Sequence, residues 1–133
     1  MTANLSPLFT AAANATPPAS LSAAEASRTA PTNAVAVVTA GANGTMITRV
    51  HVHATGTTTA GMVRLFLHDG TNYHLREEIP VTAVTPSGTV PAFSADSQVF
   101  TPATPVAIPA GWSLRAATAN AEGFRVIGEA GDF

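Results

Sequence analysis

From Ala34 onward, short runs of β-branched and apolar residues are separated by Gly, Asn, Asp and Pro at spacings of about 8 to 12 residues. Within each run the apolar residues alternate with polar ones, which is typical of strands that bury one face. No part of this region has the spacing of a helix of useful length. The pattern predicts an all-β protein, an antiparallel β-sandwich or jelly-roll of about eight short strands.

The first two expected strands are residues 34–39 and 45–54, which the turn Gly41-Ala-Asn-Gly44 separates. Alternation gives the second strand one face toward the core and one face outward. We expect the inward set to be Met46, Thr48, Val50 and Val52, and the outward set to be Ile47, Arg49, His51 and His53.

Residues 62–68 and 73–79 flank Asp69-Gly-Thr-Asn72 and are expected to pair as a hairpin. A slip of one residue would turn every side chain to the opposite face, so the apolar face fixes the register. On the outer face this register predicts the pairs Arg64–Glu78, Phe66–Arg76 and His68–His74.

A second hairpin is expected between residues 112–118 and 124–128. Residues 80–111 lie between the two hairpins and are rich in proline, which cannot donate to a strand ladder, so strands at 89–94 and 97–101 are expected at an edge. The buried face of the second hairpin is predicted to hold Trp112, Leu114, Ala116, Thr118, Phe124 and Val126.

Residues 1–33 have a different composition, dominated by Ala, Thr, Ser, Pro and Asn, with only Glu25 and Arg28 charged. Such a segment can bury little by itself. We therefore divide the chain into a flexible N-terminal arm, residues 1–33, and a sandwich domain, residues 34–133. The arm is either a disordered leader or a segment that orders on a partner, and the apolar stretch Leu5-Ser-Pro-Leu8-Phe9 favours the partner.

Composition excludes several classes of function. Charged residues make up 11% of the chain, against about 25% in ordinary soluble domains, so much of the surface is uncharged and easily buried against neighbours. The net charge of −2 and the lack of a basic cluster exclude nucleic-acid binding. No stretch approaches the ~20 apolar residues of a membrane span, and the N-terminus lacks the features of a secretory signal. Without cysteine there are no disulfides and no thiolate metal site.

Four stretches of the sequence are long enough to compare with known protein families: residues 38–44, 54–73, 78–83 and 109–115. The second contains Met62-Val-Arg-Leu-Phe-Leu-His68. Over residues 34–128, the chain resembles small proteins encoded among the virion genes of tailed bacteriophages. The resemblance implies a structural protein of the outer capsid surface, made in the host cytoplasm: a capsid decoration or cement protein. Its implied partners are the major capsid protein and copies of itself, with a trimer favoured.

His51 and His53 share one strand face, and His68 and His74 are expected to face each other across the first hairpin, spacings that a metal site can use. Neither pair has an obvious third ligand, so we expect no bound metal and no cofactor. Three copies around a three-fold axis could still share an ion at His51 or His53.

We expect no enzymatic activity. The sequence Gly-x-Ser-x-Gly is absent, and the adjacent carboxylates of Glu77 and Glu78 point to opposite faces of a strand. Trp112 is expected in the core. The alternative is that Trp112 stacks on a sugar, in which case the chain is a receptor- or glycan-binding module of a phage tail or fibre.

Overall fold

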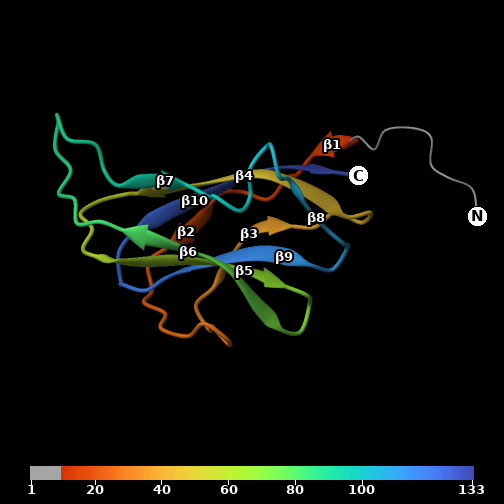
Figure 1. Ribbon diagram of the computed structural model, residues 1–133, viewed down its shortest axis with the longest axis horizontal. Coiled ribbons are helices and arrows are strands. Elements are labelled where there is room, and N and C mark those ends of the chain that lie inside the picture. Colours follow the sequence, from red (N-terminus) through yellow and green to blue (C-terminus); the bar gives the residue numbers. More distant parts are fainter. Residues whose placement is uncertain (1–9) are drawn as a thin grey trace, which may run out of the picture.

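The structure is a computed structural model that describes residues 10–133 as two antiparallel β-sheets stacked face to face (Figure 1). Ten strands and no helix are present among these residues. None of the described residues therefore forms a helix able to cross a membrane. The predicted all-β antiparallel sandwich is confirmed, with ten strands in place of about eight, and the jelly-roll order of connections stays a prediction.

The larger sheet, called sheet A, is built on the two long strands β4 (Thr45–Ala54) and β10 (Phe124–Asp132), which pair with each other. The short strands β1 (Ala12–Ala13) and β2 (Ala19–Leu21) pair with β10. On the other side, β7 (Ser94–Asp96) and β8 (Val106–Ile108) pair with β4. The proline-rich region thus contributes short edge strands, as expected because proline has no backbone N–H to donate. The strands lie at other residues than predicted.

Sheet B has the strand order β3-β9-β5-β6. Its strands are β3 (Val35–Thr39), β9 (Ser113–Thr118), β5 (Gly61–His68) and β6 (Tyr73–Val81). The core lies between the two sheets. Its fully buried side chains include Ile47, Val50, Val52, Phe124 and Val126 from sheet A and Val37, Val63, Leu65 and Leu114 from sheet B.

A β-bulge changes the expected faces of β4. Glu129 and Ala130 of β10 pair with Arg49 and Ile47, so Thr48 is an extra residue in β4. A bulge shifts which residues face inward on either side of it. Val50 and Val52 are buried as predicted, whereas the prediction that Met46 and Thr48 face the core and Ile47 faces outward was wrong: Ile47 is fully buried.

A second bulge interrupts the hairpin of β5 and β6. The predicted register is confirmed from Val63 to Leu65, including the pair Arg64–Glu78, and then shifts because Arg76 has no partner. The predicted pairs Phe66–Arg76 and His68–His74 are therefore wrong. The observed pairs are Phe66–Leu75, Leu67–His74 and His68–Tyr73.

The predicted hairpin of residues 112–118 and 124–128 was wrong, because β9 lies in sheet B and β10 in sheet A. Residues 119–123 cross between the sheets. Both strands still bury the predicted side chains, since inward faces of opposite sheets meet in the same core. Trp112 precedes β9 and is partly buried against the edge of this core.

The described part of the expected arm, residues 10–33, lies along the sandwich. Ala19 and Leu21 of β2 are each 3% exposed and belong to the core. From β2 the chain crosses to sheet B, where the N–H of Glu25 donates to the carbonyl of Thr118 at 2.8 Å. The apolar side chains of this segment are thus buried against the two sheets, although the segment has too few of them to form a core of its own. The apolar stretch Leu5-Ser-Pro-Leu8-Phe9 lies outside the described residues.

Candidate functional site

Residues 22–33, which we call the strap, cross the outer face of sheet B and are fixed by one carboxylate. Glu25, 9% exposed, accepts hydrogen bonds from the backbone N–H groups of Ser27 at 3.2 Å, Thr32 at 2.6 Å and Asn33 at 2.8 Å. These bonds, the one from Asn33 above all, lower the pKa of Glu25 because they stabilise its charged form. The carboxylate therefore closes residues 25–33 into one ordered loop.

Two arginines join the strap to sheet B through Glu78. Arg28 Nε lies 2.9 Å from one oxygen of Glu78, and Arg64 Nε lies 3.4 Å from the other. Arg64 also donates from Nη1 to the backbone carbonyl of Glu25 at 3.1 Å. The hydrogen bond from Arg28 is the main reason why the pKa of Glu78 is lowered. Arg64 is only 5% exposed, and a buried guanidinium needs such partners.

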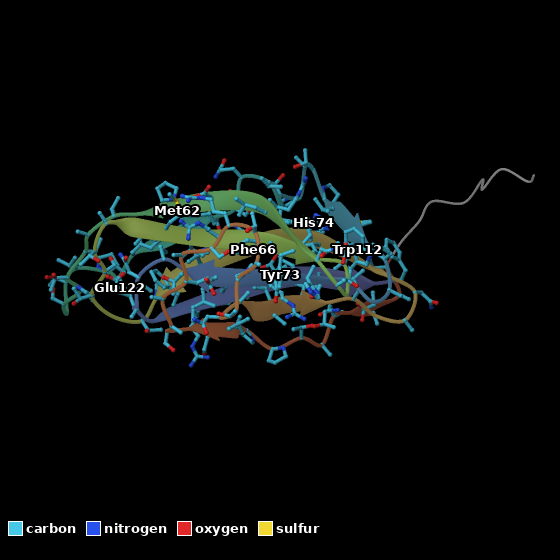
Figure 2. All side chains as sticks on the ribbon, turned by 90° about the horizontal axis from the view of Figure 1, so that it is seen from below. Met62, Phe66, Tyr73, His74, Trp112 and Glu122 are labelled. Carbon is cyan, nitrogen blue, oxygen red and sulfur yellow. The ribbon has the colours of Figure 1, made fainter. Side chains whose placement is uncertain are left out.

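The strap thus covers the outer face of sheet B around Arg64 and Glu78, and Tyr73 covers part of the rest. Phe66 and Ala117 lie outside the core cluster yet are fully buried, and the Tyr73 ring packs edge-on against Phe66 with 5.8 Å between ring centroids. Figure 2 shows Phe66 and Tyr73 next to each other. His74, which follows Tyr73 in the chain, stacks with Trp112 with 6.4 Å between the ring centroids. Trp112 is only partly buried, so the core position predicted for it is confirmed in part.

Among residues 10–133, nothing covers the outer face of sheet A in this way. It carries a shallow hollow of about 310 Å³ lined by Arg49, His51, Asp96, Ile127 and Glu129. His51 Nδ1 lies 2.7 Å from Asp96 Oδ1, and Arg49 Nε lies 3.9 Å from the same oxygen. The hydrogen bond with His51 is the main reason why the pKa of Asp96 is lowered. A second hollow of about 330 Å³ shares Arg49 and Asp96 and continues over residues 97–102.

The candidate histidine pairs are arranged differently from each other. His51 and His53 stack side by side with ring centroids 6.2 Å apart, on the outer face as predicted. His68 and His74 do not face each other: His68 contacts the Tyr73 ring at 4.4 Å, and His74 Nε2 lies 3.0 Å from Asp69. Within residues 10–133 no three or more His, Asp or Glu side chains gather as a metal site would require.

Asp69 organises the hairpin loop. It accepts the N–H groups of Asn72 at 2.7 Å and Thr71 at 2.9 Å, and these bonds, with that from His74, hold its pKa far below the ordinary value. Glu77 and Glu78 bind different elements, since Glu77 accepts from the Ser97 hydroxyl and from the N–H of Gln98 at 2.9 Å. Glu77 and Glu78 therefore each stabilise a different loop, and they do not form a pair of cooperating carboxylates.

Four residues of these surfaces were not identified from the sequence: Glu25, Asp96, Ile127 and Glu129. Glu25 did carry a signal, because it is the single acidic residue among the first 33. Ile127 and Glu129 carried little, since one exposed isoleucine or glutamate is common on any strand. Comparisons of the chain with protein-family models, with curated proteins and with solved structures found no match.

Proposed function

We propose that the protein is a structural component of a phage virion, a capsid decoration or cement protein that binds the assembled head and stabilises it. The resemblance of residues 34–128 to virion proteins is the starting point. The structural observation that supports the proposal is the fixed course of the N-terminal segment. Because this segment is held on both sheets, the apolar residues that precede Thr10 are attached to a rigid body.

The point of attachment lies beside the C-terminus (Figure 1). The N–H of Ala11 donates to the carbonyl of Asp132 at 2.6 Å, and β1 pairs with the end of β10. The chain that carries Leu5, Leu8 and Phe9 therefore enters the sandwich at this end, through Thr10. In the proposed mechanism these residues dock on a shell subunit, and binding to the assembled shell alone stabilises the shell by mass action.

The structure sets where this proposal can be tested by deletion. A cut that removes residues 1–30 would also remove Leu21 and Glu25, and with them part of the fold. Deleting residues 2–9 spares β1, β2 and the strap. We expect this truncation to keep its melting temperature within about 2 °C and to bind virions lacking the protein at least about tenfold more weakly, measured by co-sedimentation.

A matched pair of full-length variants separates apolar contacts from chain length. Changing Leu5, Leu8 and Phe9 together to Ser should weaken binding as the deletion does. Changing Thr2→Ser, Asn4→Ser and Ser6→Thr should leave it unchanged. If both variants and the truncation bind like the wild type, the N-terminal residues have no role in docking.

Copy number tests the assignment to the head itself. Quantitative mass spectrometry of purified virions should find hundreds of copies, whereas a handful would favour the tail or fibre alternative. That alternative is supported by the partly exposed Trp112 beside His74. Trp112 is the single tryptophan, so its fluorescence reports directly on saccharide binding. We expect host-surface polysaccharide to leave the emission unchanged, and a saturable change would support glycan binding instead.

A further inference from the structure

Ile127 is the one exposed large hydrophobic side chain on sheet A among residues 10–133. The large hydrophobic side chains exposed among the described residues are Val35 at 37%, Val90 at 45% and Ile127 at 40%. Val35 begins an edge strand and Val90 lies in a loop. Ile127 lies in the middle of β10, opposite His51, on the uncovered face. A single exposed isoleucine is common on a protein surface, and what distinguishes Ile127 is the arrangement of the charges around it.

Two charges flank Ile127 on the same face. Arg125 precedes it by two residues and Glu129 follows it by two, so all three side chains point outward. Neither charged side chain has a hydrogen bond or ion pair within residues 10–133. Seven of the eight acidic side chains do accept a hydrogen bond there, and Glu129 is the exception.

Arg125 and Glu129 cannot satisfy each other within one chain. Four residues of an extended strand span about 13 Å, well beyond the reach of an ion pair. The order positive, apolar, negative along one strand face is, however, self-complementary. Turned about a two-fold axis that passes Ile127 and lies perpendicular to β10 in the plane of contact, a second copy places its Glu129 against Arg125 and its Arg125 against Glu129.

We propose that the outer face of sheet A binds a second copy of this chain through a two-fold contact centred on Ile127. The hollow beside Ile127, lined by Arg49, Asp96 and Glu129, gives the long side chain of Arg125 from the second copy a place to lie near two carboxylates. Arginine and carboxylate form strong, oriented hydrogen bonds when water is excluded. On sheet B, the strap already occupies the outer face around Arg64 and Glu78.

Exchanging the two charges gives the sharpest test. Sedimentation velocity of the full-length protein should show a reversible species of twice the mass of the smallest one. Arg125→Glu and Glu129→Arg, made separately, should each raise the dissociation constant at least about tenfold, because like charges then meet. The double variant should restore it to within about threefold of the wild type, since each contact again joins opposite charges.

Ile127→Asp should raise the dissociation constant at least about tenfold, whereas the matched control Val90→Asp, at a similarly exposed site away from sheet A, should leave it unchanged. Melting temperatures check that each variant folds. The proposal is overturned if the wild type shows no doubling up to millimolar concentration, if Ile127→Asp associates normally, or if the double variant fails to restore association. Only purified protein is used, so the outcome is independent of shell binding.

Discussion

The packing of the N-terminal segment makes a quantitative prediction at Leu21. This side chain is 3% exposed, belongs to the core and lies opposite Phe124 of β10. Leu21→Ala removes apolar contact and leaves a cavity, which together cost about 2–5 kcal/mol in a well-packed core. For a protein of this size, each kcal/mol lowers the melting temperature by about 4 °C, so we expect a fall of about 8–20 °C.

Urea unfolding followed by Trp112 fluorescence gives the free energy of unfolding directly. Leu114→Ala, at a fully buried site of β9, is the positive control and should lose a similar amount. Val90→Ala, at a 45% exposed site, should change the free energy by less than about 0.5 kcal/mol.

The reasoning fails if Leu21→Ala melts within about 2 °C of the wild type while Leu114→Ala shows its full loss. That result would mean that the N-terminal segment is detached from the sandwich in solution, as expected for a flexible arm. The deletion boundary used to test shell binding would then have to move from residue 9 to residue 33.

Gly128→Ala should cost about 1–3 kcal/mol by overpacking, because its Cβ would lie 2.5 Å from Val38 Cγ2 of sheet B. Gly88→Ala, which meets no atom within 4 Å, is the control, and equal melting temperatures for the two variants would contradict the sheet-to-sheet contact. Acid should also destabilise the fold. Carboxylates with lowered pKa values stabilise the folded state above their unfolded values of about 4, and this contribution is lost as the pH falls through the folded values. Thermal melts between about pH 5 and pH 2 should therefore show a steady loss that Glu25→Gln makes shallower, and an unchanged pH profile in that variant would argue against the role of the strap. The carboxylates concerned are Glu25, Asp69, Glu78, Asp96 and Asp132.

Much of the local structure follows from the sequence. Alternation located β4 at residues 45–54 and the buried positions Val50 and Val52, and it fixed the pair Arg64–Glu78. It also placed His51 outward. These features depend on side-chain direction along a strand, which has a period of two residues and is written in the local sequence.

The bulges at Thr48 and Arg76 were not predicted from the sequence, for a physical reason. A bulge inserts one residue without a strong local signal, and its position depends on how the partner strand packs. The exchange of Ile47 for Met46 in the core, and the separation of His68 from His74, both follow from such insertions. The candidate metal pair at the hairpin was lost for this reason.

Only the tertiary structure decided which strands are neighbours and what covers each sheet. The pattern of β9 and β10 is the same whether they pair in one sheet or face each other across the core, because only the inward direction is encoded. Likewise, composition shows that residues 10–33 cannot fold alone. It does not show that they pair with the edge of β10 and accept a hydrogen bond from the buried Arg64. Burial depends on two surfaces that contact each other, and the local sequence pattern describes only one of the two.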